Sequence, residues 1–109
     1  MKSKPLLLLL LFSLNHNLYA SQFESDNDYK LICDTFINAT KSSEFKYLNR
    51  EQSMEKINDI IWENIKTKEA KNILSIIASA SPEKKYDLLK QTIELVTKNK
   101  WDCPAMRDY

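Results

Sequence analysis

The sequence contains no glycine and only one histidine, His16. Without glycine, none of the usual Gly-rich phosphate-binding loops can form. His16 lies in an N-terminal segment that we interpret below as a leader, so the rest of the chain has no imidazole for acid–base catalysis, for activating a nucleophile or for binding zinc. We therefore expect no enzyme activity, no metal and no other cofactor, with carboxylate and thiol chemistry left formally open.

The first twenty residues follow the three-part plan of a secretory signal peptide. Lys2 and Lys4 give a positive start, 6–12 is an unbroken apolar run, and Leu18-Tyr19-Ala20 is an acceptable cleavage site. The apolar run is far shorter than the ~20 residues that cross a bilayer. The sequence thus predicts residues 1–20 as a signal peptide and 21–109 as a single exported domain, either periplasmic or secreted.

Positive and negative charges are nearly balanced in the chain. Lysine and arginine together number 16, and aspartate and glutamate together number 15. A mixed, near-neutral surface lacks the concentrated basic footprint of a nucleic-acid binder, and it gives no polybasic membrane anchor. After residue 20 no second apolar run of spanning length occurs. We expect a protein partner, no nucleic acid and no transmembrane segment in the mature chain.

Cysteine occurs only twice, as Cys33 and Cys103, and both residues lie in the predicted exported part. An even cysteine count in a small secreted chain indicates a disulfide, and with two cysteines the pairing is fixed. Two free thiols are the alternative. No C-x-x-C pair is present, so a thioredoxin-type redox role has little support.

Apolar residues recur at helical spacing in four segments. The first segment begins after Asp26 or Asn27, and its apolar face includes Cys33. The second begins after Asn49, with Gln52 completing a capping-box pattern, and the third begins after Thr67. The buried positions predicted for these three segments are Tyr29, Ile32, Phe36, Ile37, Met54, Ile57, Ile61, Ile65, Ala70, Ile73, Leu74, Ile77 and Ala80.

The fourth segment has the clearest start in the chain. Ser81 is a good cap and Pro82 fits the first helical position, where its missing N–H costs nothing. Its predicted buried row is Tyr86, Leu89, Ile93 and Val96, with Leu88 and Leu95 beside it. Asn99 is expected to adopt a left-handed conformation and end the helix in place of glycine. Four amphipathic segments with short links predict an all-α domain, a small four-helix bundle or orthogonal helical array.

The C-terminal tail combines a large aromatic residue, a cysteine and a proline in Trp101-Asp102-Cys103-Pro104. If Cys103 bonds to Cys33, the tail is drawn across the first helix. Trp101 then covers the seam, and this interpretation is preferred to a ligand platform because aromatic residues beside disulfides usually fill space. Pro104 is expected to stop helix formation.

This arrangement resembles small uncharacterised exported bacterial proteins. They are similar in having an early cysteine in the first helix, an Ala-rich helix, a Pro-initiated helix with Tyr-x-x-Leu and a Trp-x-Cys-Pro tail. The matching positions in this chain are Cys33, Ala78, Pro82, Tyr86, Leu88, Leu89, Trp101, Cys103, Pro104 and Ala105. Such families often have glycine before the tryptophan, where this chain has Asn99-Lys100. The resemblance implies a helical fold and a disulfide, and no site.

A candidate interaction surface lies on the second predicted helix. Glu51, Glu55, Asp59 and Glu63 recur every four residues and form an acidic ridge, with Trp62 at its edge. The ridge suits a basic partner or a weak divalent cation, while the plainer interpretation is a solvated face relieved by Lys56 and Lys66. Trp62 is expected to be half-buried unless it forms an exposed patch with Phe45 and Tyr47. The candidate interaction surface thus comprises Glu51, Glu55, Asp59, Glu63, Trp62 and Trp101.

Three functions follow from these patterns. The leading prediction is a non-catalytic exported helical module that binds another protein. The alternative is a small inhibitor or immunity-type protein whose acidic ridge blocks a basic cleft of a secreted enzyme. The least favoured is a carboxylate-dependent hydrolase, which requires two acidic side chains that converge within ~5–10 Å.

Overall fold

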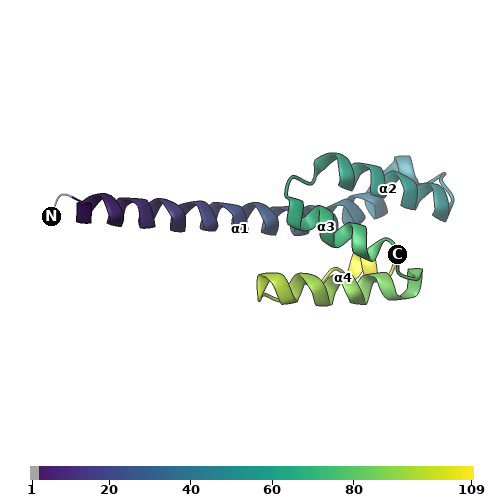
Figure 1. The fold of residues 1–109 in the computed structure, drawn as a ribbon. Helices are drawn as coiled ribbons and strands as arrows, with labels where there is room; N and C mark the ends of the chain where they lie inside the picture. The colour runs from purple at the N-terminus through teal and green to yellow at the C-terminus, as the bar shows by residue number, and fades with distance from the viewer. Residues whose placement is uncertain (1–2) are drawn as a thin grey trace.

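The computed structural model describes the backbone of residues 3–109, and the burial and side-chain contacts of residues 22–109 (Figure 1). The helices are α1 (Ser3–Lys41), the 3-10 turn η1 (Ser43–Phe45), α2 (Arg50–Asn64), α3 (Lys68–Ile77), α4 (Pro82–Thr97) and α5 (Pro104–Arg107). No strand occurs within the described range, so the all-α prediction is confirmed. The N-terminal half of α1 projects from a body that the other helices build around its C-terminal half.

The predicted start of the first helix is wrong. We expected a cap at Asp26 or Asn27, whereas α1 continues without a break from Ser3 to Lys41. The segment 21–26 contains neither proline nor glycine, so nothing in it interrupts a helix that is already formed. The signal-peptide prediction concerns side chains that lie outside the described residues, and it stays a prediction.

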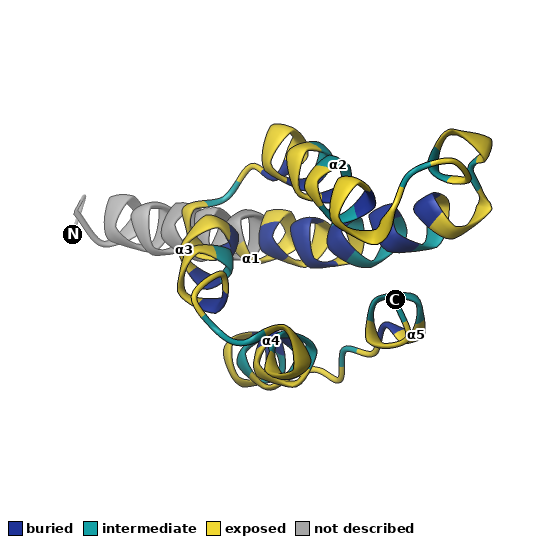
Figure 2. Cartoon of the chain, turned by 90° about the vertical axis from the view of Figure 1, so that its right-hand side faces the viewer, coloured by how far each residue is buried: buried dark blue, intermediate teal, exposed yellow. Residues whose placement is uncertain are grey.

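The core forms where α1 packs against α2 and α3 (Figure 2). Tyr29, Ile32 and Phe36 on α1 are at most 3% exposed, and Ile57 and Ile61 of α2 are at most 4% exposed. The predicted α1 face is therefore confirmed at these positions, and so is the α2 stripe. In both views α2 lies on one side of α1 and α4 on the other. α1 is thus the central element that the other helices share.

Three helix starts agree with the sequence. The Asn49 side chain accepts from the backbone N–H of Gln52, and the Gln52 side chain accepts from the N–H of Asn49, which completes the capping box. Thr67 caps α3 through Ala70. Ser81 precedes Pro82 at the first position of α4 as predicted, but its side chain forms no cap hydrogen bond. Each start is set by side chains within one turn, which is why local sequence predicts it.

Two helix ends differ from the prediction. Lys98, rather than Asn99, takes the left-handed conformation at the end of α4, with φ of 58°. Pro104 does not stop a helix but begins α5, in the first-turn position where proline is tolerated. A lysine in the left-handed region brings its Cβ close to the backbone, so this end carries a cost that glycine would avoid.

Burial on α3 and α4 follows the prediction only in part. Ala70, Leu89 and Ile93 are at most 1% exposed, as expected. Ala78, one of the positions that match the resemblance, is exposed at the end of α3. Val96 was placed in the buried row of α4, yet it is 44% exposed because that row continues from Ile93 to Thr97 instead.

The predicted disulfide is present. Cys33 on α1 and Cys103, just before α5, have their sulfur atoms 2.16 Å apart and their Cα atoms 5.6 Å apart. α5 then lies along α1, and the Tyr109 ring packs edge-on against Phe36 with ring centroids 5.6 Å apart. The bond joins the tail to the first helix, as the sequence indicated.

The buried carboxylate of Asp28 joins α1 to the turn between α2 and α3. It accepts from the backbone N–H of Lys66 at 3.1 Å, from the N–H of Thr67 at 2.8 Å and from the hydroxyl of Thr67 at 2.7 Å. The Thr67 hydroxyl oxygen in turn accepts from the N–H of Ala70 at 3.2 Å. One side chain therefore satisfies the otherwise orphaned N–H groups before α3 and orients the helix cap.

Replacing Asp28 by alanine leaves two part-buried backbone N–H groups without an acceptor. We expect Asp28→Ala to lower the free energy of unfolding by about 2–4 kcal/mol, because each unsatisfied group costs about 1–3 kcal/mol. Urea unfolding followed by circular dichroism measures this loss. Asp34→Ala, which removes only an exposed ion pair with Lys30, is the matched control and should cost less than about 1 kcal/mol.

The left-handed lysine that ends α4 provides a second test. Lys98→Gly removes the Cβ crowding at this position, and we expect it to raise the free energy of unfolding by about 0.5–1 kcal/mol. Lys100→Gly is the control, because Lys98 is the one non-glycine residue with positive φ in the described part of the chain. The control should not stabilise the protein, and an equal gain from both variants would contradict the assignment.

Candidate functional site

The predicted acidic ridge lies on the outer face of α2. Glu51, Glu55, Asp59 and Glu63 are all exposed, and none of them forms an ion pair with another described residue. Lys56, which was expected to relieve the ridge, instead pairs with Glu44 at 3.0 Å and lies 5.1 Å from the centre of the Phe45 ring. The ridge therefore presents unpaired negative charge to solvent.

Trp62 lies within this acidic face. It is 42% exposed, and it follows Asp59 by three residues and Glu55 by seven, which places all three on one side of the helix. The patch that Trp62 was expected to form with Phe45 and Tyr47 is not present. Phe45 packs on the core, and Tyr47 stands 87% exposed before the opposite end of α2.

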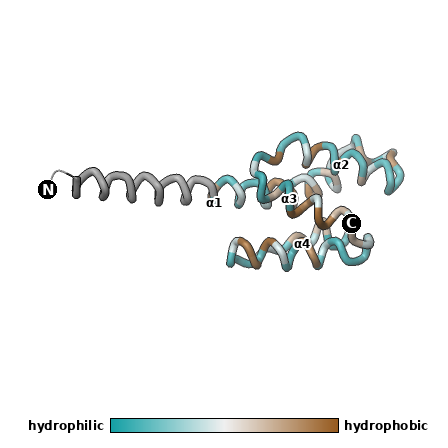
Figure 3. The backbone as a smooth tube through the Cα atoms, in the orientation of Figure 1, coloured by the Kyte–Doolittle hydropathy of each residue, from teal (hydrophilic) through white to brown (hydrophobic). Residues whose placement is uncertain are grey.

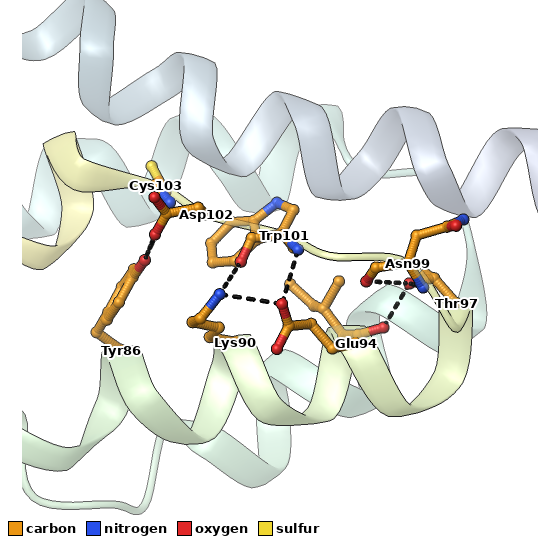
Figure 4. A network of polar contacts seen from close by, with 9 residues as sticks. Tyr86, Lys90, Glu94, Thr97, Asn99, Trp101, Asp102 and Cys103 are labelled. Atoms are coloured by element: carbon orange, nitrogen blue, oxygen red, sulfur yellow. Dashed lines mark hydrogen bonds and ion pairs between the residues drawn. The ribbon is translucent and has the colours of Figure 1, made fainter.

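Trp101 is separate from the α2 surface. It lies between α4 and α1 (Figure 4), where its ring is half-buried against the core and its indole N–H donates to the backbone carbonyl of Tyr29 at 3.1 Å. These contacts agree with a lid over the seam between the tail and α1. The structure thus brings Trp62 together with the acidic residues and places Trp101 elsewhere.

The tail before Cys103 is held on α4 by polar side chains that come from successive turns (Figure 4). The Glu94 carboxylate accepts from the N–H of Trp101 at 3.0 Å, and the Lys90 ammonium donates to the Trp101 carbonyl at 2.7 Å and to Glu94 at 3.0 Å. The Tyr86 hydroxyl donates to Asp102 at 2.8 Å and accepts from the N–H of Cys103 at 3.0 Å. We call these three α4 side chains and their bonds the tail clamp.

The sequence interpretation missed the tail clamp. The i, i+4 spacing of Lys90 and Glu94 is typical of an exposed, salt-bridged face of little individual value, whereas both residues are half-buried and hold the tail backbone. A signal was available, because Tyr86, Lys90 and Glu94 recur every four residues and so share one side of α4. Nothing local, however, identified the tail as what that side contacts.

Charge states at the tail clamp follow from these bonds. The backbone N–H of Trp101, and after it the ammonium of Lys90, lower the pKa of Glu94. The bond to Glu94 correspondingly raises the pKa of Lys90. Burial and the neighbouring Asp102 raise the pKa of Tyr86, against the opposing effect of the Cys103 N–H. Both ions therefore keep their charges at neutral pH, and the clamp stays formed.

The described residues hold no arrangement with obvious catalytic chemistry. Asp28 is the one buried carboxylate among them, and its oxygens are occupied by the α2–α3 turn. No group of histidine, cysteine, aspartate or glutamate side chains in the described region gathers closely enough to hold a metal ion. Within the same region, none of the helices combines the length and apolar character that a bilayer crossing requires.

A groove of about 370 Å³ lies between α1, the C-terminal end of α4 and the first residues of the tail. Tyr29, Cys33 and Trp101 form part of its wall, and charged residues of both signs line its rim. Every buried side-chain nitrogen and oxygen in the described part has a hydrogen-bond partner. The groove therefore offers a ligand no unsatisfied buried polar group, and the α2 surface remains the better candidate site.

Comparisons of this chain with protein families, curated proteins and solved structures find no match. The function must therefore be argued from the chain's own residues and their arrangement.

The buried tyrosine of α1 gives the protein a specific sensitivity to high pH. Burial and the Glu69 carboxylate, to which the Tyr29 hydroxyl donates, raise the pKa of Tyr29 far above its usual value. A raised pKa stabilises the native state fully below the unfolded value of about 10, and this stability is lost as the pH rises above it.

We therefore expect Tyr29→Phe to flatten the loss of stability above pH ~10, as measured by urea unfolding at a series of alkaline pH values. Tyr47→Phe is the matched control, because the Tyr47 ring is 87% exposed. Its profile should follow that of the unmodified protein. Identical profiles for all three proteins would show that Tyr29 ionises freely in the native state.

Proposed function

We propose that this chain is an exported, non-catalytic helical module that binds a basic surface of another protein through the outer face of α2. The observation that carries the proposal is the exposed Trp62 placed among the unpaired carboxylates of Glu55 and Asp59. A disulfide that joins the tail to α1 supports export to an oxidising compartment. The shortage of catalytic groups among the described residues supports a binding role.

The composition of this face favours a partner rich in lysine or arginine. Tryptophan is the best ring for cation–π contacts, and carboxylates beside it can pair with the same cation. Exposed tryptophan is also enriched among the few residues that carry most of the energy of protein interfaces. Glu51 and Glu63 extend the negative charge along α2, which steers a basic partner toward Trp62 before contact.

The face is held rigidly enough to serve as a binding surface. The capping box at Asn49 fixes the start of α2, and the bonds from Asp28 fix the turn that follows it. Ile57, Ile61 and Ile65 anchor the inner side of the helix at 4% exposure or less. A preorganised surface loses little conformational entropy on binding, so modest contact area can still give useful affinity.

The experiment places a photo-crosslinking residue at Asn58, which is exposed and lies on α2 between Glu55 and Trp62. In the exporting cells we expect a covalent adduct to another protein. The double variant Glu55→Lys/Asp59→Lys should abolish the adduct, because it reverses the charge next to Trp62. Trp62→Ala should lower the affinity of the recovered partner at least about tenfold, in line with the loss of a central interface residue.

The chain offers matched controls for both changes. Glu83 and Asp87 are exposed carboxylates with the same spacing on α4, so Glu83→Lys/Asp87→Lys reverses equal charge on another face. Tyr47→Ala removes an exposed aromatic residue away from Trp62. Both controls should keep the adduct. No adduct in folded, exported protein, or equal loss in the control variants, would refute the proposed surface.

A further inference from the structure

The two cysteines of the disulfide differ in how far solvent reaches them. Cys103 is 0% exposed, whereas Cys33 is only half-buried. Cys33 also lines the groove of about 370 Å³ between α1, the C-terminal end of α4 and the tail, and Cys103 does not. A small molecule that enters this groove therefore reaches the cysteine of α1 rather than the cysteine of the tail.

Cys103 is held in place by contacts that do not need the disulfide. The tail clamp binds the backbone of Trp101, and the hydroxyl of Tyr86 accepts from the N–H of Cys103 at 3.0 Å. Hydrophilic and hydrophobic segments alternate along α4, so the polar groups of the clamp lie beside residues that face the core (Figure 3). The Cys103 sulfur lies on the side of the tail away from Tyr86, toward α1 (Figure 4). The clamp thus presents this sulfur to α1.

A second noncovalent contact sets the tail on α1. The indole N–H of Trp101 donates to the backbone carbonyl of Tyr29 at 3.1 Å. Tyr29 precedes Cys33 by four residues, so this contact lies about one helical turn from Cys33 and on the same side of α1. Trp101 in turn precedes Cys103 by two residues. The two cysteines are therefore brought together by contacts on both α1 and α4.

We propose that Cys33 is the entry site for oxidation and that Cys103 is the resolving cysteine. The Cys33 thiolate attacks one sulfur of a small external disulfide, so a mixed disulfide forms at Cys33 and one thiolate leaves. The Cys103 thiolate then attacks the Cys33 sulfur, which forms the Cys33–Cys103 bond and releases the second thiolate. Two thiols of the chain are oxidised, and the external disulfide is reduced to two thiols.

The groove favours an oxidant that is small and carries both charges. Lysines and aspartates line it together, namely Lys30, Lys100, Asp26, Asp34 and Asp102. The disulfide of an amino acid or a short peptide carries ammonium and carboxylate groups, which can pair with side chains of both signs. The substrate class at Cys33 is therefore a low-molecular-weight peptide disulfide, of which glutathione disulfide is the probe.

The tail clamp gives the second step its speed. A thiolate that is already held beside the mixed disulfide reacts in an effectively unimolecular step, because its translational and rotational freedom has been removed beforehand. Tyr86, Lys90 and Glu94 act here as positioning residues, since none of them touches the reacting sulfurs. This inference concerns α1, α4 and the tail, so it is independent of the binding surface on α2.

The first experiment compares two reduced single-cysteine chains. Cys103→Ser leaves only Cys33, and Cys33→Ser leaves only Cys103. Each chain is incubated with glutathione disulfide, and mass spectrometry follows the mixed disulfide. We expect Cys33 to react at least about tenfold faster, because a partly exposed thiol reacts while a buried one is inert. The same reaction in denaturant is the control, and there the two rates should become similar.

The second experiment measures the role of the tail clamp in the reduced chain with both cysteines. The formation and the decay of the mixed disulfide give separate rate constants. Tyr86→Phe removes the acceptor for the Cys103 N–H, and we expect it to slow the decay about three- to tenfold without changing the formation. Lys90→Met, which removes a bond to the Trp101 carbonyl, should act in the same direction. Tyr47→Phe, at a tyrosine that is 87% exposed, is the matched control.

Circular dichroism checks that each reduced chain is folded, and Lys90→Met carries the clamp test where Tyr86→Phe alone unfolds. Several results would overturn the proposal. They are a reduced two-cysteine chain that has lost its helices, no mixed disulfide at all, a Cys103 that reacts as fast as Cys33, and folded clamp variants that resolve as fast as the control.

Discussion

The covalent bond between Cys33 and Cys103 is the constraint on which the arrangement of this protein depends. It closes a loop of 70 residues that contains α2, α3 and α4. Chain-entropy reasoning assigns such a loop about 4.4 kcal/mol of destabilisation of the unfolded state, a large share of the ~5–15 kcal/mol that stabilises a typical domain. Cys33 lies on α1 and Cys103 directly precedes α5, so the bond ties the tail to the helix that every later helix contacts.

The disulfide limits how the helices can be arranged, and specific polar contacts then fix the positions of the α2–α3 turn and the tail. Asp28 fixes the α2–α3 turn on α1, and Lys90 with Glu94 fixes the tail on α4. A chain without glycine has few ways to make a sharp backbone change, and it ends α4 with a strained lysine at Lys98. Side chains that bind backbone groups therefore hold the α2–α3 turn and the tail in place, where other proteins can use glycine-containing turns. Each helix is fixed by such contacts.

The sequence predicted those features that depend on neighbouring residues. The capping box at Asn49 lies within one turn, and with two cysteines only one intramolecular pairing exists. Prediction from the sequence failed where a residue's role depended on a contact with a distant part of the chain. Helical spacing shows which residues share a face, but not what that face contacts, so it does not reveal that Lys90 and Glu94 bind the tail. Pro104 can end one helix or begin another, and only the packing of α5 on α1 decides between them.

The proposed binding surface on α2 gains its interest from this placement. Its acidic residues surround Trp62, which is 42% exposed, while Ile57 and Ile61 on the inner side of the helix are buried in the core. Such a face need not move for binding, so the shortage of flexible backbone that disfavours a lid or a catalytic loop costs a binding protein nothing.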